Sequence, residues 1–308
     1  MCRIASFFCK MQVVALLFWG CVVVDVQAAK FVSVTILDRD YVVIHLQDGE
    51  VLHQDEANKV EQVLRHTPEL DATAATQTGN WRISSSDDGS YGTTGRHPQH
   101  CSRKKKLNGH AEMGWSGNDY LYEYTYEHWI YLHLPSPLQQ GSTYQLAIDS
   151  SVNSDTSRAF FTFDQFTSVS EAIHVNLVGY SPDAPHKAAD LYYWMGSGGP
   201  RDYSSFQGNT VYLYRVGTGE TVPVGTVQFW KPGGTDVFNY NLTGSDVWSI
   251  DFSGASPSPG TYRLVVEGVG CSQDFQMGND VYRDPFGVAV LGYFYMRIGE
   301  SNPTGISP

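Results

Sequence analysis

The chain has 308 residues, of which 42% are hydrophobic and 17% charged, and its formal net charge is -12. This composition excludes disorder throughout, and the length predicts about two domains. The negative charge argues against nucleic acid and anionic lipid as partners, because like charges repel, and it leaves neutral polysaccharide open. Aromatic residues make up 13% of the chain, and 30 glycines and 14 prolines supply turns. That combination favours short strands over long helices.

The first residues have the pattern of an export signal. Two basic residues precede an apolar run from Met11 to Val24, which is too short to span a bilayer comfortably. Small residues around Ala28 offer a cleavage site, so we assign residues 1–28 as a signal peptide. The mature protein is then secreted, periplasmic or on the cell surface, with no membrane contact after cleavage. The alternatives are an uncleaved anchor and lipid attachment at Cys21.

Only two cysteines, Cys101 and Cys271, follow this signal. They lie far apart in the sequence and in different predicted modules. Two cysteines do not make a disulfide framework, and we predict two unpaired thiols. The mature fold is therefore expected to hold by its core.

Residues 29–168 are predicted to form an N-terminal β-sandwich module. Phe31–Asp38 alternates apolar and polar residues as a half-buried strand does, and Tyr41–Leu46 follows after a charged turn. At least six strands with short connections predict a β-sandwich. The later strands are expected at Tyr120–Tyr126, Trp129–Leu134, Thr143–Ile148 and Arg158–Phe163.

Three stretches of this module lack a strand pattern. Asp55–Leu70 carries three apolar residues at helix-like spacing, which predicts a short helix. Asp71–Gly79 is rich in Thr and Ala and is expected to be a mobile loop. From Trp81 to Gly117 turn residues mark loops, and no regular order is predicted.

Residues 169–280 are predicted to form an immunoglobulin-like sandwich, because about seven short strands alternate with Gly- and Pro-rich turns. The antibody-type disulfide is not supported, since only Cys271 lies here. Tyr262 follows Pro259-Gly260 in a late strand, where such folds place a corner tyrosine bonded to nearby backbone. The strands are expected at Ile173–Leu177, Lys187–Trp194, Thr210–Arg215, Thr221–Phe229, Asp246–Phe252, Thr261–Val266 and Cys271–Met277.

The pattern changes at the C-terminal end. Val281–Arg297 has apolar residues on most faces and predicts a buried helix that begins near Pro285. A helix of this kind must be covered by other protein. We expect it to press on the sandwich and on further helices outside residues 281–308.

Acidic pairs are candidates for chemistry, because glycoside hydrolysis needs two positioned carboxyl groups. The candidates are Asp87 with Asp88, and Asp280 with Asp284. Both pairs lie in or beside turns, where Asp bonds nearby backbone N–H groups. We therefore expect turn-forming roles and assign no catalytic residue.

His97, His100, Cys101 and His110 carry the side chains that zinc prefers, but their spacing matches no standard zinc site. No metal or cofactor site is assigned. Arg103–Lys106 is a basic run that binds polyanions in some proteins. In a chain this acidic we predict a solvated loop instead, with polyanion binding as the alternative.

Five aromatic residues of the second module were considered for stacking on sugar rings. In sandwich strands such residues more often belong to the core, because alternate side chains point inward. The residues are Tyr192, Tyr193, Trp194, Trp230 and Trp248.

The segment Glu171–Lys187 (EAIHVNLVGYSPDAPHK) resembles the opening of the N-terminal immunoglobulin-like domain of glycoside hydrolase family nine cellulases. The chain departs from the family pattern at Leu177, where Gln is usual. Pro259–Val265 and Ser272–Met277 are similar to the late strands of that domain. The residues that agree in the opening segment are Val175, Asn176, Val178, Gly179, Tyr180, Pro182 and Lys187.

Val281–Arg283 and Phe294–Arg297 look like the linker and the first helix of the family's catalytic barrel, so the resemblance covers about Ser170 to Pro308. It implies that residues 281–308 are the start of a truncated (α/α)6 barrel. The family's barrel hydrolyses β-1,4-glucan with inversion through an Asp pair and a distant Glu. The Asp-Ala-Gly-Asp motif is absent here, and no catalytic residue carries over.

The resemblance therefore implies the non-catalytic N-terminal portion of a secreted cellulase-like hydrolase. Its implied partners are the missing catalytic barrel, in the same polypeptide, and β-glucan. The alternative is a stand-alone extracellular carbohydrate-binding or adhesion protein.

Overall fold

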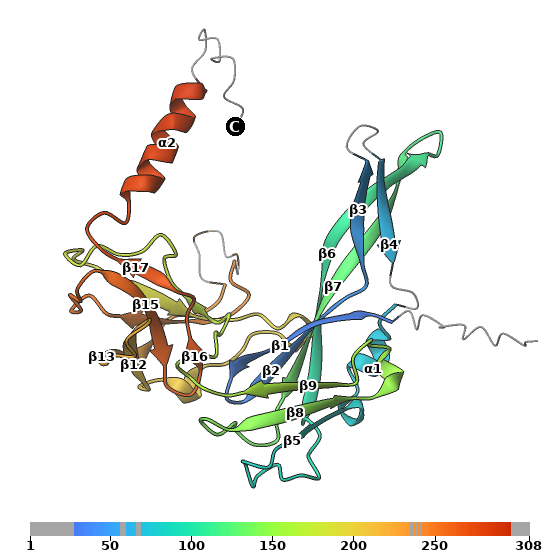
Figure 1. Ribbon diagram of the computed structural model, residues 1–308, viewed down its shortest axis with the longest axis horizontal. Coiled ribbons are helices and arrows are strands. Elements are labelled where there is room, and N and C mark those ends of the chain that lie inside the picture. The colour runs from blue at the N-terminus through green and yellow to red at the C-terminus, as the bar shows by residue number, and fades with distance from the viewer. Residues whose placement is uncertain are drawn as a thin grey trace, which may run out of the picture.

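The computed structural model describes residues 28–55, 60–65, 69–234, 237, 240 and 242–296. The predicted signal peptide up to residue 27 and the segment after Met296 therefore lie outside the described residues. Within the described part, two β-rich bodies lie side by side, and a strand arm and a helix project from them (Figure 1). Most of the regular structure is strand, which confirms the prediction of an all-β chain.

The first body packs a four-stranded sheet against a three-stranded sheet. The larger has the antiparallel order β1-β2-β7-β6, and the smaller has the order β5-β8-β9. Side chains from both sheets share one core, in which Trp81, Tyr144 and Leu146 are fully buried. The strands are β1 (Lys30–Asp38), β2 (Tyr41–Gln47), β5 (Trp81–Ser84), β6 (His100–Trp115), β7 (Tyr120–His133), β8 (Thr143–Ile148) and β9 (Arg158–Thr162).

The helix predicted over Asp55–Leu70 is wrong. A strand pair stands there instead, formed by β3 (Gly49–Asp55) and β4 (Val60–Arg65), in which Val51 lies opposite Val63. The strands also contact the long β6–β7 hairpin. Strand pairing and this contact outweigh the helix-like spacing of the apolar residues.

The mobile loop predicted over Asp71–Gly79 is also wrong. Asp71 caps the short helix α1 (Ala72–Ala75) by accepting hydrogen bonds from two backbone N–H groups, and a 3-10 turn follows at Thr78–Asn80. The Trp81 indole N–H donates to the carbonyl of Ala75 at 2.9 Å and fixes this segment on the core. The stretch after it, for which no order was predicted, contains β5 and the 16-residue strand β6.

The second body is a sandwich of eight strands, which confirms the immunoglobulin-like prediction. The long strand β13 belongs to both layers, because its first half pairs with β12 and its second half pairs with β14. The strand order is β10-β11-β14-β13-β12-β15-β16, with β17 on β15. The bounds are β10 (Ile173–His174), β11 (Ala188–Leu191), β12 (Thr210–Arg215), β13 (Thr221–Lys231), β14 (Val247–Asp251), β15 (Gly260–Val266), β16 (Gly270–Cys271) and β17 (Phe275–Met277).

Tyr262 has the corner role predicted for it. Its ring is 4% exposed, and its hydroxyl donates to the backbone carbonyl of Ser258 at 2.8 Å. The bond ties β15 to the Pro-rich turn before it, which is a structural function.

A buried ion pair joins the two bodies. The guanidinium of Arg201, in the second body, donates from Nε to Asp38 Oδ2 at 2.8 Å and from a terminal nitrogen to Asp40 Oδ2 at 3.1 Å. Asp38 is fully buried, so this pair is shielded from solvent. Apolar residues of the first body, Leu37, Val43 and Tyr131, extend the core of the second.

A lysine enclosed by aromatic rings, which we call the lysine cage, also lies where the two bodies meet. The ammonium of Lys104, on β6, stands 4.9 Å from the ring centroid of Trp129 and 5.2 Å from that of Tyr193 in the second body. Burial lowers the pKa of Lys104. The two bodies therefore meet through packed, specific contacts.

Cys101 and Cys271 are both buried and unpaired, as predicted. Burial raises the pKa of the Cys101 thiol to about 12 and that of Cys271 to about 11.

The predicted C-terminal helix is present as α2 (Arg283–Tyr295). Its expected burial against the sandwich is wrong, because none of its residues is buried and it projects away from the second body (Figure 1). Among the described residues, no helix is both long and apolar enough to cross a membrane.

Candidate functional site

The candidate site lies where the second body meets α2, and its base is residues 175–187, which we call the motif loop. Asn176 closes the first turn of this loop. Its side chain donates to the carbonyl of Gly179 at 3.1 Å and accepts from the N–H of Val178 at 3.1 Å. Its own N–H donates to the hydroxyl of Tyr180 at 2.9 Å. The turn is thus held by side chains, as is usual for Asn.

Gly179 is required by the close approach of β17. Its φ is +116°, and a Cβ there would clash with the carbonyl oxygen of Gln276. The next residue, Tyr180, donates from its N–H to the same carbonyl at 2.9 Å and from its hydroxyl to Ala188 O at 2.8 Å. Its ring packs edge-on against Phe252 in the core. The loop and β17 therefore form one rigid unit.

Lys187 ends the motif loop with a buried charge. The side chain is 1% exposed, and its ammonium donates to the carbonyls of Pro182 at 3.0 Å and Ala184 at 2.9 Å. Buried ammonium groups need such partners. The Pro and the Lys of the motif therefore act together to fix the shape of the loop.

Tyr282 attaches α2 to this loop. Its hydroxyl donates to the carbonyl of Gly179 at 2.9 Å and accepts from the side-chain amide of Asn176 at 3.4 Å. Leu177 and Val178 point outward beside it and are exposed. A hollow of about 490 Å³ lies between Val178 and the start of α2. Its lining is mixed, with Val178 and Val281 beside Asp280 and Asp284.

The surface of α2 is apolar beyond its first turn. Asp284 and Arg283 stand in its first turn, and no charged residue follows them in the helix. A helix that is apolar on every face normally lies inside a folded domain. The exposed side chains are Phe286, Val288, Val290, Leu291, Tyr293, Phe294 and Met296.

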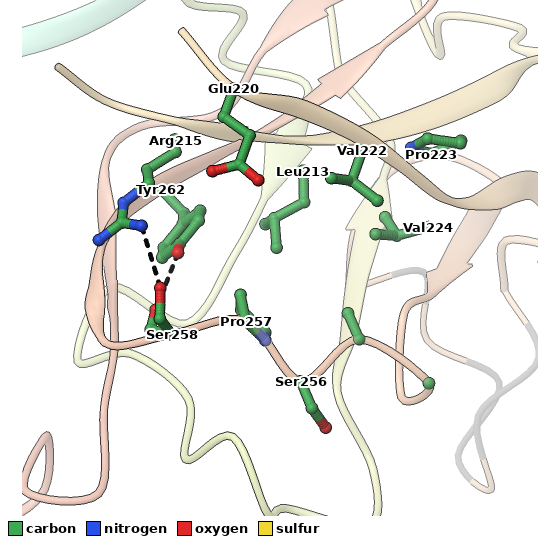
Figure 2. A pocket seen from close by; sticks show the side chains of 12 residues that line it. Leu213, Arg215, Glu220, Val222, Pro223, Val224, Ser256, Pro257, Ser258 and Tyr262 are labelled. Carbon is green, nitrogen blue, oxygen red and sulfur yellow. Dashed lines mark hydrogen bonds between the residues drawn. The ribbon is translucent and has the colours of Figure 1, made fainter. Parts of the chain in front are cut away.

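A second hollow, of about 520 Å³, opens between β12, β13 and the Pro-rich turn 254–258 (Figure 2). Leu213 and Val222 give it an apolar wall. The Arg215 guanidinium donates to Ser258 Oγ at 3.0 Å, so it is held by the turn. Glu220 is the one acid among the lining residues, and a single carboxylate cannot supply the pair that glycoside hydrolysis requires.

The acidic pairs have structural partners. Asp87 accepts from the N–H of Thr143 at 3.1 Å, and Asp88 accepts from a tyrosine hydroxyl at 2.8 Å. Asp280 accepts through its backbone carbonyl at the start of α2, and Asp284 lies in the first turn of that helix. An acid in that position is favoured by the helix dipole.

The four side chains of the metal-like cluster are not brought together. His97 Nδ1 lies 2.7 Å from the carbonyl oxygen of Trp81. His100 and His110 stand on one strand roughly 30 Å apart, given its rise per residue. Cys101 is buried in the core. No group of three metal-binding side chains occurs among the described residues.

The basic run is part of β6, so the predicted solvated loop is wrong. Alternation along the strand sends Arg103 and Lys105 to one face and Lys104 to the other. Arg103 donates to His128 at 2.9 Å, and Lys104 occupies the cage described above. The charges therefore do not form one patch for a polyanion.

The five aromatic candidates of the second body do not share a surface. Tyr193 and Trp248 are buried, and Tyr192 is stacked on His174 at 4.0 Å between ring centroids. Trp194 and Trp230 are exposed. A sugar platform of five rings is therefore not assembled.

The model of the cellulase N-terminal immunoglobulin-like domain matches residues 168–271. Endoglucanase D of Acetivibrio thermocellus is 42% identical over 67 residues, which cover 22% of this chain and 10% of that enzyme. The match thus spans about a tenth of the relative. Together they confirm the resemblance predicted from the motif: residues 168–271 form an immunoglobulin-like region of the cellulase N-terminal type.

Solved structures give only distant similarity. The N-terminal part of the bacterial S-layer protein SbsC overlaps 82% of this chain and 44% of that chain, with 13% identity and a TM-score of 0.28. Domains 1–6 of surface layer protein SbsC overlap 82% of this chain and 25% of that chain, with 15% identity and a TM-score of 0.28. At that TM-score the overlap does not bear on fold or function.

Proposed function

We propose that the chain is the non-catalytic N-terminal portion of a secreted, cellulase-like glycoside hydrolase, and that its immunoglobulin-like region supports a catalytic domain. The observation that carries the proposal is α2, which is apolar on every face, exposed, and attached to the motif loop through Tyr282. A 13-residue helix is marginal alone in water. Packing against further helices stabilises it, and Leu177 and Val178 extend the same apolar surface.

The catalytic domain we propose is an (α/α)6 barrel whose first helix is α2. Its activity is hydrolysis of β-1,4-glucan with inversion, in line with the cellulase-type match of residues 168–271. The carboxylates for that reaction belong to the barrel, and we assign none to the described residues. The chain itself is expected to release no sugar from soluble cellulose.

Secretion is the second part of the proposal, with removal of residues 1–28. The backbone N–H of Ala29 donates to Asn153 O at 2.9 Å, and its carbonyl accepts from the N–H of Asp155 at 3.0 Å. Ala29 is also fully buried. Cleavage before Ala29 therefore keeps every described contact of the first body except those of Ala28.

The direct test is the sequence of the locus downstream of the codon for Pro308. We expect several hundred further residues with helical periodicity, an Asp pair and a distant Glu. A stop codon there, with no such reading frame, contradicts the proposal.

The apolar surface formed by α2, Leu177 and Val178 is tested in the longer protein that the whole locus is expected to encode. Val178→Asp places a charge between the motif loop and α2 and should lower the melting temperature and the rate of carboxymethylcellulose hydrolysis. Val222→Asp is the matched control, because it is a similarly exposed valine on the same body, away from α2. Equal effects of the two variants contradict docking at the motif loop.

A further inference from the structure

A row of aromatic side chains runs along one face of the β6–β7 arm. Tyr120, Tyr122 and Tyr124 occupy alternate positions of β7, so they share one face. They are 54%, 43% and 39% exposed, and Trp115 on β6 is 59% exposed. Neighbouring tyrosine ring centroids lie 6.4 Å apart, and the Trp115 ring lies 4.8 Å from that of Tyr120. We call these four residues the aromatic stripe.

The opposite face of the arm is covered where it lies against β3, whereas Leu121, nearer the tip on that face, is 51% exposed. Gly109 lies across from Thr125, and a Cβ on Gly109 would stand 2.7 Å from a methyl group of Val51 on β3. Thr125 itself is 1% exposed. The part of the arm that packs on β3 therefore lies on the face away from the aromatic stripe.

Two bulges in β6 determine which side chains join the stripe. Extra residues at Asn108 and Met113 shift the register against β7. Without the second shift Trp115 would point to the covered face, and with it Trp115 pairs with Tyr120 on the open face. The first shift likewise brings His110 across from Tyr124, where the His110 ring lies 5.5 Å from that of Tyr122. Bulges commonly aim side chains in this way at functional sites.

The dimensions of the stripe fit a slender ligand. Same-face residues of a strand stand about 7 Å apart, so Tyr120 to Tyr124 spans about 14 Å. At the observed exposures, four rings present about 300 to 500 Å² of surface. A stable protein partner needs about 800 Å² on each side. A single row of rings is therefore too narrow for a globular partner and suits a linear chain.

The chemistry of the stripe fits a neutral, hydroxyl-rich ligand. Ring faces stack on the apolar faces of sugar rings, and the tyrosine hydroxyls are donors and acceptors at the edge of the row. One acid, Glu112, pairs with Tyr122, and one base, Lys105, lies 3.4 Å over the Tyr126 ring at the foot of the row. These opposite charges leave no net preference for a charged ligand.

We propose that the aromatic stripe of the β6–β7 arm binds a single chain of neutral β-linked glucan by ring stacking. The choice of β-1,4-glucan rests on the proposed function, whereas the stacking of sugar rings rests on the stripe alone. The stripe lies on the first body, apart from the aromatic residues of the second body considered above.

The test is calorimetric titration of the full chain with cellohexaose, with maltohexaose as the control for linkage. Cellohexaose should bind and maltohexaose should not. Tyr122→Ala should weaken binding about tenfold, which corresponds to about 1.4 kcal/mol. Tyr122→Phe, which keeps the ring, should bind within a factor of two or so of the unmodified chain. Circular dichroism and the melting temperature confirm that each variant is folded.

Two matched controls locate the effect. Leu121→Ala removes a side chain of similar exposure from the other face of β7, and Trp230→Ala removes an exposed ring from the second body. Both should leave the affinity unchanged. The proposal is overturned if the unmodified chain ignores cellohexaose, or if either control weakens binding as much as Tyr122→Ala. Self-association that Tyr122→Ala abolishes would instead identify a protein contact and also overturn it.

The titration and the test of the proposed function can fail separately. No catalytic domain takes part in the titration, so a stripe that ignores cellohexaose leaves the role of α2 untouched. Conversely, a locus without a catalytic domain leaves any measured binding to the stripe in place.

Discussion

The β6–β7 arm projects from the first body and α2 from the second, and the two differ in how their apolar side chains are distributed. The helix α2 is apolar all round, whereas the β6–β7 arm is covered by β3 on part of one face and carries the aromatic stripe on the other. A helix of the first kind is stabilised only by cover on every side. A single row of exposed rings is tolerated on the surface of a folded protein, so the rings stay accessible to a ligand. We therefore expect a permanent interface at α2 and a reversible one on the arm.

The two projections also differ in how they are attached. At the foot of the arm, buried His128 lies 2.6 Å from Asp48 Oδ2 through Nε2 and 2.9 Å from Arg103 through Nδ1. At the foot of α2 the tie is the partly exposed hydroxyl of Tyr282, which donates to the carbonyl of Gly179. The arm is therefore anchored by a desolvated polar network, and α2 by a bond that water weakens.

Removing the anchor of the arm should give the largest effect. Asp48→Ala leaves His128 buried without its carboxylate and also removes the acceptor for the Leu70 N–H. We expect a loss of about 3 kcal/mol in the free energy of unfolding, as for other broken buried pairs. Urea denaturation measures it. Asp119→Ala, at the exposed tip of the arm, is the control and should change stability by less than about 0.5 kcal/mol.

The same network predicts a pH dependence. Burial alone raises the pKa of Asp48, but the hydrogen bond and charge of His128 outweigh it, so the pKa lies below its ordinary value. The contribution of Asp48 is therefore complete above about pH 4 and is lost as the pH falls through the folded-state pKa. Asp48→Asn should flatten the fall in stability in acid. An unchanged acid limb would show that the pair does not stabilise the arm.

A charge on α2 should give the next largest effect, on association instead of stability. Exposed apolar surface of this extent promotes self-association. Leu291→Glu should weaken it by about 2 kcal/mol, roughly thirtyfold, because one buried leucine is lost from the contact. Sedimentation equilibrium measures the association constant. Tyr122→Ala, on the arm, should leave it unchanged, and a monomeric unmodified chain would contradict the comparison.

A substitution in the core of the second body gives a reference value with which the effects at the arm and at α2 can be compared. Tyr262→Phe removes the bond to Ser258 O and should cost about 1 kcal/mol in unfolding free energy. It should change neither association through α2 nor binding to the stripe. A change in either would show that the projections are coupled to the sandwich core.

Loosening the foot of α2 should give the smallest effect. Tyr282→Phe should cost about 0.5 kcal/mol, because the hydroxyl is partly exposed and water replaces its partners. Hydrogen exchange in α2 should nevertheless become faster, since the helix loses its tie to the motif loop. A loss as large as that of Asp48→Ala would mean that the two attachments are equivalent.

The motif loop was the part most open to prediction, because its geometry is dictated locally. Asn176 closes a turn, and Gly179 adopts a left-handed φ. The ammonium of Lys187 donates hydrogen bonds to two carbonyl oxygens within five residues of it in the sequence. Each requirement admits few residue types, so the pattern alone is specific. The backbone bond of Tyr262 was predictable for the same kind of reason, because it depends on the Pro259-Gly260 turn just before it.

Of the arm, the strand β7 was predicted as Tyr120–Tyr126 and Trp129–Leu134, which form one continuous strand, whereas β6 and the β3–β4 pair were missed because their order depends on contacts between strands. Val60, Val63 and Leu64 have helical spacing, yet β4 pairs with β3, and this pairing depends on partners that local periodicity does not reveal. The glycines and lysines of β6 are typical of a loop, and the segment forms a strand because it pairs with β7. One available signal was the tyrosine at every second position from Tyr120 to Tyr126, which marks a single strand face.

The two buried thiols give each body its own reporter. Because burial holds the pKa of Cys101 near 12 and that of Cys271 near 11, neither is a thiolate at neutral pH, and alkylating reagents attack thiolates. Labelling therefore requires that the surrounding sheet open. Since one thiol sits in the first body and one in the second, the two alkylation rates follow the opening of each half separately in the unmodified chain.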